Sequence, residues 1–123
     1  MSEIVTEKVV VNTTGAAGSA TGSANSRALH GFLLDVFLDY HADAPATTDT
    51  TLEYDDNNDD ILVVSNNKTD GRYAPMKNAC DVAGAAISGV YVNYPLNGPV
   101  TVSLVGCDEL TPALTAWIRY LKP

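Results

Sequence analysis

The sequence predicts an all-β protein, built as an antiparallel β-sandwich or jelly-roll-like barrel of about seven to nine short strands. Three runs alternate apolar and polar residues with a period of two, at residues 32–40, 100–105 and 114–121. Such alternation is typical of strands with one buried face. Segments rich in Gly, Pro, Asn and Asp separate the runs at 97–99 and 106–112. The chain shows no pattern of a long helix and no internal repeat.

At the N-terminus, residues 3–13 have the high β-propensity of a strand. Residues 14–26 are rich in Gly, Ala, Ser and Thr, which leaves two interpretations open. One is a flexible linker. The other is a turn at Gly15–Gly18 followed by a small-residue strand over 19–24, which would let another backbone approach closely. The second interpretation predicts an N-terminal β-arm or hairpin.

The longest apolar run is Ala28–Tyr40. As a helix it would place Asp35 and Asp39 on one face, four residues apart. The density of Val and Phe, together with the internal Gly31, favours a strand.

The middle of the chain alternates short strands with polar turns. Residues 50–54, 61–65 and 72–75 are expected to be extended, the last because Ala74 precedes a proline. Residues 41–48, 55–60 and 66–71 are expected to be loops or turns. Residues 81–88 fit either one helical turn or a small-residue loop.

Length and charge exclude several classes of function. The 123 residues suffice for one domain with a core that needs no metal or disulfide. With a net charge of −8 and seven Lys and Arg residues, we expect no nucleic-acid and no membrane partner. No apolar run approaches the roughly 18 residues that span a bilayer. The first residues lack the features of a signal peptide, so we expect synthesis in a host cytoplasm.

Two cysteines, Cys80 and Cys107, allow one disulfide. In a chain without a secretory leader we expect two reduced, packed thiols. A thiol-redox role would need a C-x-x-C pair or a nearby basic group, and the sequence has neither.

A possible metal site is the segment Asp55-x-Asn57-x-Asp59, which matches the opening ligands of a calcium loop. The match then fails, because Asp60 replaces the turn glycine and Asn66 stands where a bidentate Glu is required. The sequence therefore predicts a solvated acidic turn and no metal or cofactor.

Catalytic groups are equally sparse. His30 and His41 lie near Asp35, Asp39 and Asp43, but a site needs three convergent ligands or a nucleophile with its base. No serine lies in a G-x-S-x-G motif. We therefore expect no enzyme.

Five aromatic residues offer the material for a carbohydrate or peptide groove: Tyr73, Tyr91, Tyr94, Trp117 and Tyr120. On a β-sandwich such residues are more often core edges and cross-strand partners, which is the interpretation that we favour.

Several motifs follow one another in an order known from a protein family. They are Gly31–Tyr40, Tyr73-Ala-Pro75, Asp81–Ala86, Pro95–Ser103 and Ile118-Arg-Tyr120. In this order the chain resembles small all-β proteins that are encoded beside the major capsid protein of tailed bacteriophages. The motifs are turn and strand signatures and include no catalytic residue.

The resemblance covers about residues 28–121, and it implies a head decoration, or cement, protein of the virion. Such a protein binds the outer capsid surface and bridges neighbouring capsomers without chemistry. It would have the major capsid protein as its partner and form a homotrimer.

On this hypothesis the chain divides into an N-terminal arm, residues 1–26, and a β-sandwich domain, residues 27–123. The arm is our candidate for contact with the capsid or a neighbouring copy, because its valines can pair as an edge strand and its glycines permit close approach. The candidate contact residues are Val5, Val9, Val11, Gly15, Gly18 and Gly22.

Two alternatives compete with this hypothesis. One is a carbohydrate- or receptor-binding β-sandwich module of a virion, for which Tyr54 and the acidic turn at 55–60 supply aromatic and polar groups. The other is a small β-barrel enzyme, which the missing frame of histidine and carboxylate groups argues against.

Overall fold

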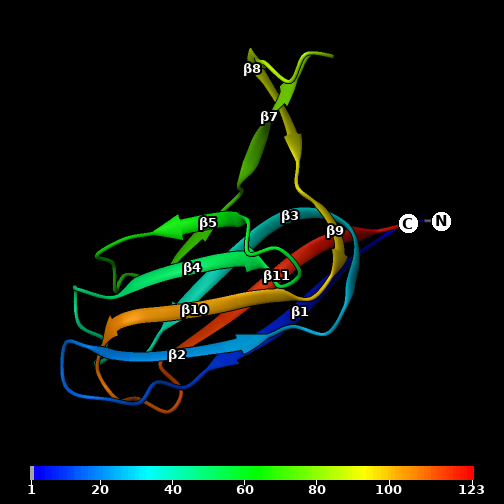
Figure 1. Ribbon diagram of the computed structural model, residues 1–123. Coiled ribbons are helices and arrows are strands. Elements are labelled where there is room, and N and C mark those ends of the chain that lie inside the picture. Colours follow the sequence, from blue (N-terminus) through cyan, green and yellow to red (C-terminus); the bar gives the residue numbers. More distant parts are fainter. Residues whose placement is uncertain (1) are drawn as a thin grey trace.

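Two antiparallel sheets packed face to face, with a two-stranded hairpin projecting from them, make up the computed structural model (Figure 1). The structure describes residues 2–123, and within that range it contains strands, turns and loops but no helix. The predicted all-β class and β-sandwich architecture are therefore confirmed.

Eleven strands are present in the described range, more than the predicted seven to nine, because several are short and two form the unforeseen hairpin. Their bounds are β1 Glu3–Val11, β2 Ala20–Asn25, β3 Leu29–Tyr40, β4 Asp49–Tyr54, β5 Asp60–Val64, β6 Gly71–Tyr73, β7 Met76–Cys80, β8 Ala86–Asn93, β9 Pro95–Gly98, β10 Val100–Cys107 and β11 Leu114–Lys122.

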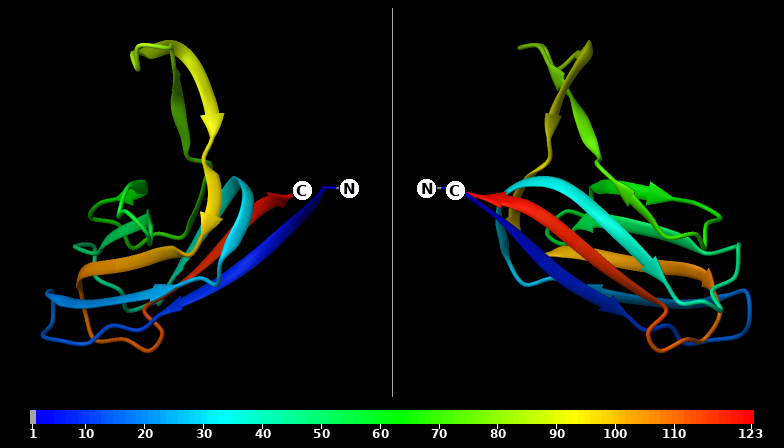
Figure 2. Two further views of the ribbon diagram at one scale, coloured as in Figure 1. Left: turned by 45° about the vertical axis from the view of Figure 1, so that its right-hand side comes forward. Right: turned by 180° about the vertical axis from the view of Figure 1, so that it is seen from behind.

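The five-stranded sheet has the order β1-β11-β3-β6, and β9 pairs with β3 beyond the end of β6. The four-stranded sheet has the order β2-β10-β4-β5. Strands β7 and β8 pair only with each other and rise from the sandwich, as the two further views in Figure 2 show. The hairpin therefore grows out of the segment between β6 and β9, both of which flank β3.

The N-terminal segment belongs to the sandwich. Strand β1 pairs with β11 in unbroken register from Glu3 opposite Lys122 to Val11 opposite Leu114. After a turn at residues 15–19, strand β2 pairs with β10. Of the two interpretations of residues 14–26, the structure shows the turn and small-residue strand, and the segment supplies an outer strand to each sheet.

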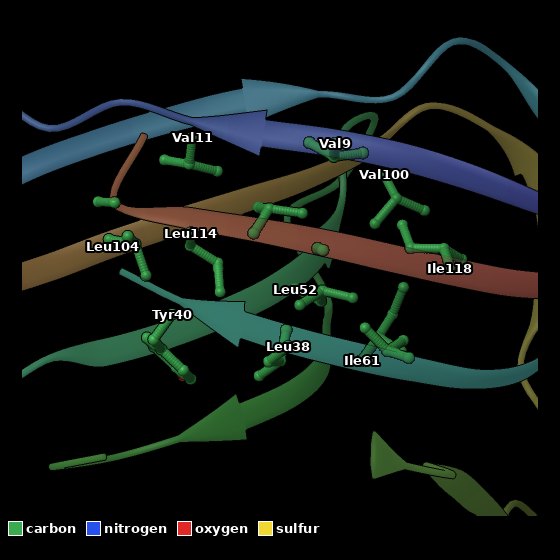
Figure 3. Packing of buried hydrophobic residues seen from close by; sticks show 14 of the residues in the cluster. Val9, Val11, Leu38, Tyr40, Leu52, Ile61, Val100, Leu104, Leu114 and Ile118 are labelled. Carbon is green, nitrogen blue, oxygen red and sulfur yellow. The ribbon is translucent and has the colours of Figure 1, made fainter. Parts of the chain in front are cut away.

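The core lies between the two sheets (Figure 3). Val11, Leu38, Leu52, Leu104 and Ile118 are all almost completely buried and come from both sheets. Burying each such side chain contributes about 1.5–3 kcal/mol to folding. The alternation seen in the sequence therefore marks the inward faces of both sheets.

One buried hydrogen bond joins the layers. The Tyr40 hydroxyl on β3 and the Thr50 hydroxyl on β4 lie 2.6 Å apart inside the core. Burial raises the pKa of Tyr40 above its ordinary value. The pair satisfies two polar groups that would otherwise be costly to bury.

Candidate functional site

The predicted contact residues of the N-terminal segment divide by their burial. Val9 and Val11 are in the core, and Val5 is half-buried against it. Val5 also lines a hollow of about 540 Å³ at the end of the sandwich, together with Arg27 and Tyr120. A contact through β1 would therefore use its outward side chains and not Val9 or Val11.

The glycines of the same segment serve the chain's own turns. A Cβ on Gly22 would lie 2.0 Å from the carbonyl oxygen of Asn12, and one on Gly15 would lie 3.0 Å from the Cα of Ala20. Gly18 adopts a φ of 77°, and its amide donates to a carboxylate oxygen of Asp108 at 2.9 Å. The close backbone approach expected here is thus made within one chain.

The projecting hairpin is the most exposed apolar element of the described chain. It consists of β7, β8 and the tip between them, and we call it the β7–β8 hairpin. Half of the large hydrophobic side chains that are exposed in residues 2–123 lie on it: Met76, Val82, Ile87, Val90, Tyr91 and Val92. The hairpin was not predicted, because strands that are exposed on both faces show no alternation of apolar and polar residues.

Both faces of the β7–β8 hairpin carry apolar groups. Residues paired across antiparallel strands share a face, so Lys77 and Val92 lie on one face while Asn78 and Tyr91 lie on the other. Met76 pairs with Asn93 and shares the second face. The two faces therefore differ in chemistry: one carries Val92 beside Lys77, and the other carries Tyr91 and Met76 beside two asparagines.

Side-chain hydrogen bonds give the hairpin a defined shape. The Asp81 carboxylate accepts from the amides of Ala83 at 2.9 Å and Ala85 at 3.0 Å, which forms a tight tip. The Asn78 amide reaches the carbonyl of Ile87 at 3.4 Å, beside a register shift in the pairing. The segment 81–88, for which the sequence allowed a helical turn or a loop, is the tip and the start of β8.

A second feature is a hollow of about 310 Å³ at the base of the hairpin. The Tyr54 hydroxyl donates to the Pro95 carbonyl at 2.7 Å, which fixes the ring, and the Tyr94 ring lies 6.4 Å away between centroids. Burial, followed by the neighbouring Tyr94, raises the pKa of Tyr54. The polar lining residues are Asp56, Asn57, Asp59, Lys77 and Asn97.

The acidic turn is held by hydrogen bonds to neighbouring strands and by one within the turn. An oxygen of Asp55 accepts from Asn25 at 3.1 Å and from Thr101 at 3.2 Å. The Asn57 side chain accepts from the Asp59 amide at 3.0 Å. Among residues 2–123, no three His, Cys, Asp or Glu side chains come together as metal ligands.

The two histidines are in different places. The His30 ring lies 3.0 Å from the Asn97 side-chain oxygen, and His41 accepts from the amide of Asp43 at 2.9 Å. Neither arrangement unites a histidine with a nucleophile.

Both cysteines are free. Cys107 is buried in the core, as expected of a packed thiol, whereas Cys80 is exposed on β7. The expectation that both thiols are packed is therefore wrong for Cys80, because it lies on a hairpin that the sandwich does not cover.

The structure also shows that no helix in the described chain could cross a membrane. Comparison with known proteins finds no matching family model and no matching curated protein. Among solved structures, the chain is similar to a mutant of CBM29-2, a family 29 carbohydrate-binding module, at 7% identity and a TM-score of 0.36, covering 98% of this chain and 84% of that one. A likeness at this TM-score carries no argument about function.

Proposed function

We propose that this protein is a non-enzymatic head decoration protein that binds the outer surface of a tailed-phage capsid and stabilises it by bridging capsomers. The β7–β8 hairpin is the single observation that carries the proposal. The hairpin extends beyond the core of the sandwich, so it can reach a neighbouring molecule. The resemblance over residues 28–121 is our ground for proposing the major capsid protein as the partner and the surface of the virion as the place.

An isolated two-stranded hairpin is only marginally stable in water. This one exposes Val90 at 45%, Tyr91 at 55% and Val92 at 44%. Contiguous exposed apolar groups mark interaction sites in soluble proteins. Its outer edges also present unpaired main-chain groups, to which a partner can add a strand.

The charge distribution supports the same use. Lys77 and Asp81 are the two charged residues between 76 and 93, so the hairpin is neutral in a chain of net charge −8. Covering it costs little desolvation of charge. Its two faces differ, so a contact of one face on the other between copies would be head-to-tail, and such contacts build a ring, as in the expected homotrimer, where the rotation between copies closes. Multiple contacts per oligomer would then hold the shell by avidity.

Co-sedimentation with purified heads assembled without this protein tests the proposal. The double variant Val90→Thr/Val92→Thr keeps β-propensity and shape but removes apolar surface from the hairpin. The matched control is Val63→Thr/Val105→Thr, which changes valines exposed at 54% and 47% on the four-stranded sheet.

We expect the hairpin variant to bind heads about thirty-fold more weakly, since each of the two lost apolar contacts costs about 1 kcal/mol. The control variant should bind like the unaltered protein. Equal binding by both variants would remove the hairpin from the contact, and no binding by the unaltered protein would reject the proposed function.

A second candidate function is carbohydrate binding in a virion module, favoured by the hollow at the hairpin base. A fixed Tyr54 ring beside carboxylates and amides offers stacking and hydrogen bonds to a sugar. A glycan array probed with the full chain tests it. Saturable binding that the exposed-side-chain variant Asp56→Ala abolishes would support this function, and an array without saturable signals would reject it.

A further inference from the structure

The strand register places four side chains in one row across the outer face of the five-stranded sheet. Lys8 on β1 is opposite Trp117 on β11, Trp117 is opposite Phe37 on β3, and Phe37 is opposite Arg72 on β6. At about 4.8 Å between strands, the row extends for about 14 Å. It has an aromatic centre and a cation at each end.

The cations cover the rings beside them. Lys8 Nζ lies 5.1 Å from the centroid of the Trp117 ring, and the guanidinium carbon of Arg72 lies 5.3 Å from that of Phe37. Such cation–aromatic pairs hold the two charged groups over the sheet. The row is thus a defined surface and not a set of independent side chains.

The neighbouring rows add apolar area and remove negative charge. Ile4 is opposite Leu121, which is opposite Phe32. Between this row and the aromatic one, Asp35 is buried and bound by both Arg119 and Arg72. The central carboxylate is therefore already neutralised.

The five-stranded sheet exposes more large hydrophobic side chains than the four-stranded sheet does. Ile4 is exposed at 63%, Phe32 at 50%, Val10 at 42% and Trp117 at 36%, all on the outer face of the five-stranded sheet. The outward face of an antiparallel sheet is normally polar. Aromatic and arginine side chains at this density are typical of protein interfaces.

Charge is also distributed unevenly between this face and the rest of the protein. The face carries Lys8, Arg72 and Arg119, three of the seven basic residues, against Asp35 and Asp39. Its net charge is therefore +1, so the rest of a chain with total charge −8 carries −9. The face therefore repels an acidic partner less than the rest of this acidic protein does, and its cations can meet the partner's carboxylates.

We propose that the outer face of the five-stranded sheet docks on an acidic protein surface with an apolar centre. This inference rests on the proposed function, under which that surface is the exterior of the capsid shell. Trp117 and Phe37 pack on the apolar centre, and Lys8 and Arg72 meet carboxylates on either side. A sugar would have to displace the cations from the ring faces, and phosphate-rich partners would require more cations than three.

Lysine footprinting tests the inference, because four lysines report on four regions. Lys8 lies on the docking face, Lys77 on the β7–β8 hairpin, Lys68 in the turn before β6 and Lys122 at the end of β11. The full chain is acetylated free and bound to heads assembled without it, and mass spectrometry measures each lysine. We expect Lys8 to react at least about five-fold more slowly when bound, and Lys68 to react equally in both states.

Charge reversal supplies the second measurement. We expect Lys8→Glu to weaken co-sedimentation by about ten-fold, whereas the matched control Lys68→Glu changes it less than about two-fold. Raising NaCl from about 50 to about 300 mM should weaken binding of the unaltered chain and narrow the difference between the variants.

Each outcome decides a different claim. Binding to heads with Lys8 as reactive as in the free chain overturns the docking face and leaves decoration intact. No binding of the unaltered chain removes the proposed function and the inference with it. Protection of Lys8 in the free chain that increases with its concentration assigns the face to a second copy, which also overturns docking on the shell.

Discussion

Arg119 on β11 holds the Asp35 carboxylate on β3 through two hydrogen bonds, one of them from Nε to Oδ1 at 2.8 Å. Arg72 adds a third at 3.1 Å. The Arg119 hydrogen bond, assisted by the charges of both arginines and opposed by burial, holds the pKa of Asp35 below its ordinary 3.8. This carboxylate ties three strands of the five-stranded sheet together beneath the proposed docking face.

Because the folded state lowers the pKa of Asp35, the free energy of unfolding depends on pH. Asp35 stabilises the fold above its unfolded pKa near 4, and that contribution disappears as pH falls through its lower folded value. We expect Asp35→Asn to lower the free energy of unfolding by about 1 kcal/mol at pH 7. Its stability should also fall less between pH 4 and pH 2 than that of the unaltered protein.

Urea unfolding at several pH values measures this, with the exposed Asp39→Asn as the control. Identical pH profiles for Asp35→Asn and the unaltered protein would show that Asp35 has the same affinity for protons folded and unfolded.

The bond between Tyr40 and Thr50 predicts coupling between the two sheets. Tyr40→Phe and Thr50→Val each leave a buried hydroxyl without its partner, so each should cost about 1–3 kcal/mol. The double variant removes both polar groups and should lose less than the sum of the single losses. A double-mutant cycle by thermal or urea unfolding measures the coupling, and strict additivity would show that the two hydroxyls do not interact.

Gly22 on β2 lies close to the backbone at Asn12, so we expect a larger residue at this position to destabilise the fold. A Cβ there would lie 2.0 Å from the Asn12 carbonyl oxygen, so the backbone must shift to accept one. We expect Gly22→Ala to cost about 2–3 kcal/mol, as overpacking does elsewhere. Ser23→Ala, at the next and exposed position, is the control and should leave the melting temperature unchanged. Equal melting temperatures for both variants would contradict the close approach.

We expect the two thiols to react at different rates, because they differ in exposure. Cys80 is exposed on the hairpin and Cys107 is buried. In the native protein a maleimide reagent should label one site rapidly, and peptide mapping should locate it at Cys80. Cys107 should react after denaturation. Rapid labelling of Cys107 under native conditions would show that the core around β10 opens readily.

The sandwich was predictable because one-sided burial imprints alternation on the sequence. The run at 32–40 forms the C-terminal three quarters of β3, and 114–121 forms most of β11. For residues 14–26 the sequence left a linker and a small-residue strand open; the structure has the strand, and the backbone close to it is the chain's own, at Asn12. Local sequence cannot state which partner a glycine accommodates.

The β7–β8 hairpin was not predictable from the same signal. Its side chains are exposed on both faces, so alternation has no reason to appear, and Gly89 adopts a φ of 78° within β8. The row of four side chains on the proposed docking face could not be predicted from the sequence for another reason. Lys8, Phe37, Arg72 and Trp117 are far apart in the sequence, and strand register alone unites them.

Electron cryomicroscopy of heads assembled with and without this protein tests the central claim most directly. We expect added density on the outer surface of the shell into which the sandwich fits, with the β7–β8 hairpin buried in a contact. The outer face of the five-stranded sheet should lie against an acidic patch of the capsid protein. Heads that are identical with and without the chain, or density in which the hairpin points freely into solvent, would contradict decoration through the hairpin.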